Sequence, residues 1–168
     1  MPQLAGEDIL ASDIKVPRYI PKSASESVTS STTLQDDNDF VVELTPGTWR
    51  IELMLHWSGD SVASGVGDIK TAWTTTGTMT LLGRWLIGGG TNFVSATEMP
   101  VRMQGAALAT AVSYQGNATN SNALKEDILL DVDVTGNLQL QWAQNASSAV
   151  ATTVQTVSRM YITEMEAV

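Results

Sequence analysis

The sequence predicts an all-β fold, a jelly-roll-like two-sheet β-sandwich with an extended N-terminal arm. Short runs that alternate apolar and polar residues recur from Phe40 onward, and this alternation is typical of strands that bury one face. Turn residues separate the runs at the spacing expected of a sandwich or barrel. No run has a convincing helical period, and 168 residues suffice for one domain with its own core.

The first 35 residues differ from the rest of the chain. Pro2, Pro17 and Pro21 are spread through them, and the run SASESVTSSTT offers little to bury. Such a segment has few reasons to fold alone. We therefore assign residues 1–35 to an extended N-terminal arm and residues 36–168 to the sandwich. One alternative stays open, in which this segment supplies one or two edge strands that lie across the domain.

The first predicted strands follow this arm. The run DFVVEL ends at TPG, where Pro46 and Gly47 suit the centre of a tight turn. Residues 48–57 then show the cleanest alternation in the chain, and every second residue from Arg50 to His56 is expected to face outward. The residues between them form a wide apolar stripe for the core, which consists of Trp49, Ile51, Leu53, Leu55 and Trp57.

The middle of the chain gives weaker signals. Residues 68–89 read as two strands rich in Thr and Trp on either side of Gly77. Two weaker strands are expected within residues 92–105 and 107–116, and Pro100 places the first of these at an edge or a bend. The alanines of residues 105–112 have some helical propensity, but the segment is short.

The last third of the chain returns to clear alternation. Residues 127–134 place Ile128, Leu130, Val132 and Val134 on one face. Residues 135–137 form a predicted hairpin turn. The following strand, residues 138–144, buries the face that carries Trp142, and a final strand covers residues 157–165.

Composition excludes several classes of function. The formal net charge is −9, and the 9 Lys and Arg residues are scattered, which argues against nucleic acid, because phosphates require clustered cations. The chain has no cysteine, so it forms neither disulfides nor thiolate metal sites. No stretch approaches the length of a membrane span, and no signal peptide is recognisable. We therefore expect a protein made in the cytoplasm with no membrane partner.

The search for catalytic or metal-binding residues yields no candidate site. His56 is the only histidine and lies on a face predicted to point outward, so it supports neither a catalytic triad nor a zinc site. The acidic run Asp36 to Asp39 offers oxygen ligands for calcium but lacks the glycine and the distant Glu of a calcium loop. A solvated turn is the preferred interpretation. Asp131 and Asp133 are interpreted as outward carboxylates on one strand face. We predict no enzyme activity, no cofactor and no metal.

Tryptophan is the remaining residue type of interest, because exposed indoles contact sugars and partner proteins. Three of the five tryptophans follow the apolar side of their strands and are assigned to the core, namely Trp49, Trp57 and Trp142. Trp73 and Trp85 are left as possible surface aromatics.

Two segments carry a resemblance to a known group of proteins. Residues 136–165, GNLQLQWAQNASSAVATTVQTVSRMYITEM, resemble the C-terminal part of tailed-bacteriophage virion proteins, in which a strand ending in a QWAQ-like sequence precedes a small-residue segment and a final strand. The run LTPGTWRIELMLHWSG resembles an early strand of the same proteins. Together they cover about a quarter of the chain. The resemblance implies a jelly roll of the tumour-necrosis-factor and C1q kind, assembled as a homotrimer.

The function implied by this resemblance is that of a capsid decoration protein on the outer surface of the virion head, whose partner is the major capsid protein. A tail or fibre protein that acts in host adsorption and a carbohydrate-binding adhesion module remain as alternatives. The chain has no collagen-like repeat and no coiled coil to form a fibre shaft, which favours decoration. The arm would then dock apolar residues onto the capsid, and the candidates are Ile9, Leu10, Ile14, Val16, Tyr19 and Ile20.

Overall fold

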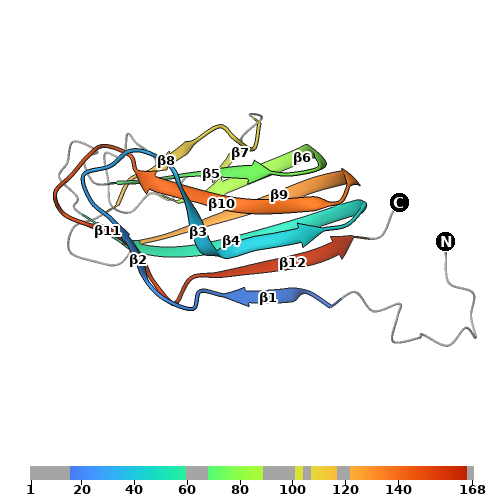
Figure 1. Ribbon diagram of the computed structural model, residues 1–168, viewed down its shortest axis with the longest axis horizontal. Helices are drawn as coiled ribbons and strands as arrows, with labels where there is room; N and C mark the ends of the chain where they lie inside the picture. Colours follow the sequence, from blue (N-terminus) through green and yellow to red (C-terminus); the bar gives the residue numbers. More distant parts are fainter. Residues whose placement is uncertain (1–15, 60–67, 89–100, 104–106, 117–121, 166–168) are drawn as a thin grey trace, which may run out of the picture.

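The computed structural model describes residues 16–59, 68–88, 101–103, 107–116 and 122–165. Within these ranges the chain forms two antiparallel sheets packed face to face as a sandwich (Figure 1). The predicted all-β, jelly-roll-like fold is confirmed. The described ranges contain no helix that is long and apolar enough to cross a membrane.

The larger sheet, called sheet A, has eight strands, and its main path runs in the order β1-β12-β4-β9-β6-β7. β11 pairs with both β2 and β4 beside this path. The strands of sheet A are β1 (Arg18–Pro21), β2 (Glu26–Val28), β4 (Gly47–Ser58), β6 (Thr78–Ile87), β7 (Val101–Met103), β9 (Asn122–Val134), β11 (Thr152–Val154) and β12 (Arg159–Met165).

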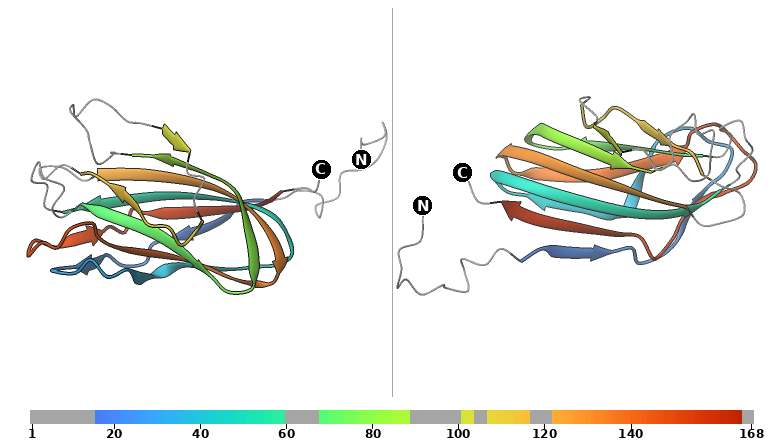
Figure 2. Two further views of the ribbon diagram at one scale, coloured as in Figure 1. Left: turned by 90° about the horizontal axis from the view of Figure 1, so that it is seen from above. Right: turned by 180° about the vertical axis from the view of Figure 1, so that it is seen from behind.

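The smaller sheet, called sheet B, has four strands in the order β3-β10-β5-β8. The chain passes from one sheet to the other at each of the connections β3–β4, β4–β5, β5–β6, β8–β9 and β9–β10, as in a jelly roll. Figure 2 shows the two layers from two further sides. The strands of sheet B are β3 (Gln35–Leu44), β5 (Ile69–Thr75), β8 (Val112–Tyr114) and β10 (Gly136–Gln144).

The core lies between the sheets and follows the predicted alternation. The stripe of β4 is buried, with Ile51, Leu53 and Leu55 at 0% exposure. Trp57 and Trp142 are buried as predicted, and Trp49 lies at the margin of the core, where its Nε1 donates to the Thr45 carbonyl. The face predicted for residues 127–134 is buried as far as Val132, but Val134 is 54% exposed because the strand ends there.

Residues 16–35 belong to the sandwich. β1 pairs with β12 at the edge of sheet A, and β2 pairs with β11. For this part of the N-terminal segment the structure matches the alternative of edge strands that lie across the domain. Residues 1–15, which include Ile9, Leu10 and Ile14, lie outside the described residues, and an extended arm stays a prediction for them.

The two weak strands are short in the structure. β7 covers residues 101–103 at the edge of sheet A next to β6, and Pro100 lies outside the described residues. A turn at residues 108–109 replaces any helix before β8, which pairs with β5.

Two tight turns meet at one end of the sandwich. Gly77 joins β5 to β6 with a φ of +76°, a conformation that residues with a side chain rarely adopt. The β9–β10 turn packs against it, because Thr76 donates its N–H to the Asn137 carbonyl at 2.9 Å and accepts the Asn137 N–H on its hydroxyl at 2.8 Å. A Cβ at Gly136 would lie well inside contact distance of the Thr76 carbonyl oxygen. Gly136 is therefore required for the two turns to approach this closely.

We expect Gly136→Ala to destabilise the fold by about 1–3 kcal/mol, because the backbone must shift to relieve the overlap. Urea unfolding measures the effect. Val134→Ala, two residues away on an exposed side chain, is the matched control and should stay within about 0.5 kcal/mol of the parent. Equal stability of the two variants would contradict the close packing of these turns.

Candidate functional site

The N-terminal edge of sheet A is the candidate functional site. β1 is antiparallel to β12 and begins with Arg18 opposite Ile162, three residues before β12 ends at Met165. The described chain therefore enters and leaves at the same end of the sandwich (Figure 1). Among the described strands, β1 has β12 as its only partner, and its other edge is free to pair.

The predicted docking residues that the structure describes are largely exposed. Val16 is 74% exposed and Tyr19 is 55% exposed. The Tyr19 ring packs on Tyr161 of β12 with a centroid distance of 5.3 Å and a tilt of 42°. Ile20 is half-buried and packs against the core. The edge thus presents apolar side chains that are already partly ordered by their neighbours.

A buried lysine holds this edge in place. The side chains of Lys22 and Asp37 are both at 0% exposure. Lys22 Nζ donates to Asp37 Oδ1 and Oδ2 at 3.0 and 2.9 Å, to Glu26 at 2.5 Å and to Asp39 at 3.3 Å. The same ammonium lies 5.4 Å from the centre of the Phe40 ring. Every proton of the ammonium has an acceptor, which is what a buried cation requires.

This cluster joins the two sheets. Lys22 follows β1 in sheet A, and Asp37 lies within β3 of sheet B. The Lys22 N–H also donates to the Ser158 carbonyl, and the Ser23 hydroxyl donates to Asp39 at 2.6 Å. The connection between β1 and β2 is therefore tied to both β3 and the start of β12.

The structure corrects the interpretation of the acidic run as a solvated turn. Asp37 is 1% exposed and lies inside β3, where its Oδ1 also accepts the N–H groups of Asp39 and Phe40. Asp36 points elsewhere and accepts a hydrogen bond from Gln141. A carboxylate from outside the run completes the cluster, and Glu26, Asp37 and Asp39 lie close enough to hold a metal ion. The Lys22 ammonium occupies the centre of these carboxylates, so the cluster has its cation already.

The pKa values of two groups in the cluster, Lys22 and Asp39, shift toward the charged forms. Burial by itself would lower the pKa of Lys22, but hydrogen bonds to Glu26 and Asp37 outweigh it and raise the pKa above the ordinary 10.5. Burial would likewise raise the pKa of Asp39, but hydrogen bonds from Ser23 and Lys22 outweigh it and lower the pKa below 3.8. The ion pairs therefore stabilise the folded state across the neutral range.

Trp73, which the sequence left as a possible surface aromatic, is buried at 0% exposure. Its Nε1 donates to Glu126 at 2.9 Å, between the sheets. Glu126 is fully buried and also accepts hydrogen bonds from Thr71 and Tyr114. Because this hydrogen bond gives the indole N–H an acceptor, the ring is buried without leaving a polar group unpaired.

Glu126 pairs with a buried arginine. Arg84 Nε donates to Glu126 at 3.0 Å, and Nη1 reaches the Thr110 carbonyl at 3.3 Å. Nη2 lies 2.8 Å from the same carboxylate, within ion-pair distance but without the geometry of a hydrogen bond. Burial raises the pKa of Tyr114, so its phenol stays protonated and donates to Glu126. The cluster links β6 and β9 of sheet A to β5 and β8 of sheet B.

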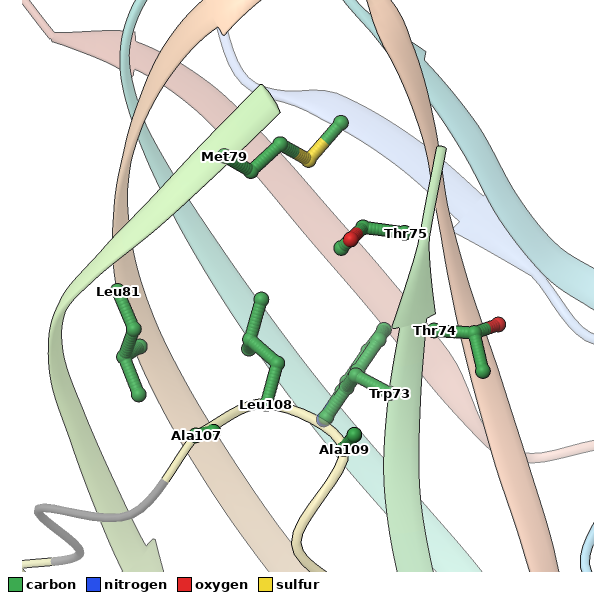
Figure 3. Close-up of a pocket in the computed structure, with 8 residues that line it drawn as sticks. All are labelled: Trp73, Thr74, Thr75, Met79, Leu81, Ala107, Leu108 and Ala109. Atoms are coloured by element: carbon green, nitrogen blue, oxygen red, sulfur yellow. The ribbon is translucent and has the colours of Figure 1, made fainter. Parts of the chain in front are cut away.

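An open hollow of about 450 Å³ lies beside this cluster, where β5 and β6 diverge from their turn (Figure 3). Leu108 points into it between Leu81 and Trp73, and the Leu108 carbonyl accepts the Trp73 N–H at 3.0 Å. None of its lining residues is charged, so the hollow has no group that would orient a polar ligand. The lining consists of Trp73, Thr74, Thr75, Met79, Leu81, Ala107, Leu108 and Ala109.

The remaining residues considered in the sequence lie on the outside of sheet A. His56 is half-buried on the outward side of β4, as its alternation predicts. Asp131 and Asp133 share the outward side of β9. Trp85 of β6 is 39% exposed. The structure does not bring these residues together into a catalytic arrangement.

Sequence reasoning missed both buried ion clusters. Glu126 shares its strand parity with Ile128 and Leu130, so the alternation already placed a carboxylate on the apolar side of β9. Arg84 has the same relation to Leu86 in β6. Lys22 gave no comparable signal, because it follows a short edge strand among prolines and serines.

Comparison with known proteins adds no relative: no protein-family model matches the chain, and the search of curated proteins found no match.

We expect Lys22→Met to cost about 3 kcal/mol in the free energy of unfolding at neutral pH, because it leaves buried carboxylates without their cation. Lys70→Met on the outer side of sheet B is the matched control, since it changes the net charge equally at a half-buried position. Denaturant unfolding of both variants measures the difference. Equal stability would show that the cluster does not hold the edge.

The stability difference between the parent and Lys22→Met should also depend on pH in a defined direction. The lowered pKa of Asp39 means that its stabilisation is present above pH 3.8 and is lost as the pH falls through the folded value. The raised pKa of Lys22 means that its stabilisation is present below pH 10.5 and is lost as the pH rises through the folded value. The difference in the free energy of unfolding between the parent and Lys22→Met should therefore be largest between these two pH values and should decrease both below and above them. A difference that increases in acid would contradict the assignment.

Proposed function

We propose that this chain is a bacteriophage capsid decoration protein, which binds the outer surface of the head as a homotrimer and stabilises the capsid. The proposal begins from the resemblance of residues 44–59 and 136–165 to virion proteins. In the structure these segments supply β4, β12 and the short β11 of sheet A and β10 of sheet B. They account for the fold and leave attachment to another part of the chain.

The observation that carries the proposal is the N-terminal edge. β1 is fixed by Lys22 and presents a free strand edge with exposed Val16 and Tyr19. The 15 residues before Val16 could span roughly 50 Å when extended. An edge strand with a segment of this length suits attachment by strand addition to a neighbouring protein.

The charge of the chain agrees with a position outside the head. A net charge of −9 repels packaged DNA and limits association between particles. The major capsid protein is the proposed partner, and the chain needs no nucleic acid for this role.

The alternatives use different parts of the molecule. A sugar-binding module needs exposed aromatics beside a polar groove, and of the two candidates only Trp85 is exposed. A tail or fibre protein shares the edge strand but would occur in few copies per particle. The sugar-binding alternative gives the N-terminal edge no role, and the number of copies per particle separates the tail or fibre alternative from decoration.

Deletion of residues 2–15 tests the role of the arm while leaving β1 and its lysine in place. We expect the shortened protein to unfold at the same denaturant concentration as the parent. It should no longer bind capsids that were prepared without the native protein. Cosedimentation with those capsids is the measurement.

The matched control for surface apolarity is the full-length double variant Val150→Ser, Val157→Ser. These valines are 53% and 55% exposed and lie outside the N-terminal edge. The control should bind capsids like the parent. Full binding by the shortened protein would show that the arm is not the point of attachment.

A further inference from the structure

We propose that the outer face of sheet A is the surface at which copies of this chain associate with one another. This inference rests on one part of the proposed function, the homotrimer, and identifies the surface through which the copies would contact one another.

The outer face of sheet A carries the side chains typical of protein interfaces. One cross-strand row runs through Trp85, Asp127, Glu52, Tyr161 and Tyr19 over the strands β6, β9, β4, β12 and β1. Aromatic residues, Met and Arg are enriched in interface cores relative to other surface residues. The neighbouring outward positions add Arg50, Met54, Ile87, Leu129, Arg159 and Met165.

The indole of Trp85 is presented flat. A Cβ at Gly83 would lie 2.6 Å from the Trp85 ring, so the ring covers the glycine on the outer side of β6. The indole thus rests on the backbone of its own strand and remains 39% exposed. A rigid aromatic of this kind loses little side-chain entropy when a partner covers it.

The charges of this face nearly balance, unlike those of the chain. Where β4 pairs with β9 and β12, three cations, Arg50, Lys125 and Arg159, stand beside three anions, Glu52, Asp127 and Asp131. Asp133 at the end of β9 brings the net charge of these outward positions to −1, whereas the chain carries −9. Two copies of so acidic a protein repel one another less when the surfaces that meet carry little net charge.

Most of these charges pair within the chain. Arg50 bonds to Asp127 at 2.5 and 3.0 Å and to Glu52 at 3.3 Å, and Lys125 bonds to Glu52 at 2.7 Å. Charges that are already paired can be covered by another surface at a lower desolvation cost than single ones.

Two opposite charges on the face are left over. Arg159 has a buried Nε with no hydrogen-bond partner, and neither it nor Asp131 makes an ion pair with any described residue. They lie opposite Met54 and Thr48, six positions apart along β4 and roughly 20 Å from one another, so they cannot meet within one chain. In an assembly of identical copies, Arg159 of one copy can pair with Asp131 of the next. This complementarity favours a second copy over an unrelated partner.

Sheet B offers no comparable surface. Its outward side has no aromatic, Met or Arg side chain at the paired positions and carries amide, hydroxyl and small side chains together with Val41 and three charged residues, Asp36, Glu43 and Lys70. Gln139 and Gln141 are already bonded to the Asp37 carbonyl and the Asp36 side chain. Its outward positions from the paired strands are Asp36, Val41, Glu43, Lys70, Ala72, Thr74, Ser113, Asn137, Gln139, Gln141 and Ala143.

The test is the mass of the full-length protein in solution, measured by light scattering after size-exclusion chromatography. We expect an oligomer for the parent. Met54→Arg should reduce the mass to the 17.9 kDa of one chain, while Thr74→Arg on sheet B, the matched control, should leave the oligomer intact. A monomeric parent, or an unchanged mass for folded Met54→Arg, would overturn the proposal.

A charge exchange tests the pairing between copies. Arg159→Glu should dissociate the oligomer, and the added substitution Asp131→Arg should restore it by reversing both charges of each pair. A folded double variant that stays monomeric would overturn the pairing.

A thiol readout covers the case in which an arginine prevents folding. The chain has no cysteine, so Met54→Cys and Gln141→Cys each introduce a single thiol. The thiol at position 54 should resist maleimide in the oligomer and react after dilution to the monomer, whereas the thiol at position 141 should react in both. Equal reactivity at position 54 in both states would overturn the proposal. An oligomer that fails to bind capsids would refute the proposed function alone. A monomer that binds them would refute this inference and the homotrimer, but would leave capsid binding in place.

Discussion

The ammonium group of Lys22 is the contact on which the N-terminal edge depends. A chain without cysteine has no disulfide between its sheets, and here a buried cation provides a polar link. Lys22 follows β1 of sheet A and bonds to Asp37 of β3 in sheet B. A lysine buried without partners would be too costly to keep. The carboxylates that pair with Lys22 therefore fix the position of the segment that carries this lysine.

Several features follow from this fixed edge. β1 becomes the outermost strand of the main path of sheet A, so the described part of the chain begins at a sheet edge. Tyr19 packs on Tyr161 and extends the cross-strand row on the outer face of sheet A by one strand. The proposed attachment to a capsid and the proposed association between copies thus use adjacent surfaces that share Tyr19.

Alternation predicted what depends on strand periodicity alone. The stripe of β4, the inward face of β9 and the burial of Trp142 follow from every second residue being apolar. Alternation failed where a polar group is buried with a partner from a distant strand. Trp73 was left as a possible surface aromatic, but it is buried and its indole N–H donates to Glu126 of the opposite sheet. Asp37 was expected in a solvated turn, and its partner Lys22 lies 15 residues away in a segment with no strand signal.

The two outer faces of the sandwich divide the surface by chemistry. Sheet A presents aromatic side chains and mostly paired charges, whereas the outward positions of sheet B carry amide, hydroxyl and small side chains with few charges and no aromatic residue. In a decoration protein, a face like that of sheet A would be covered by other copies, and a face like that of sheet B would remain in contact with water. The acidic charge that the chain carries elsewhere would then face the exterior of the particle.

The copy number of this polypeptide relative to the major capsid protein, measured by quantitative mass spectrometry of purified particles, tests the proposed function most directly. A decoration protein is predicted to occur in numbers comparable to those of the capsid subunits. A handful of copies per particle would contradict that role and assign the protein to the tail or a fibre.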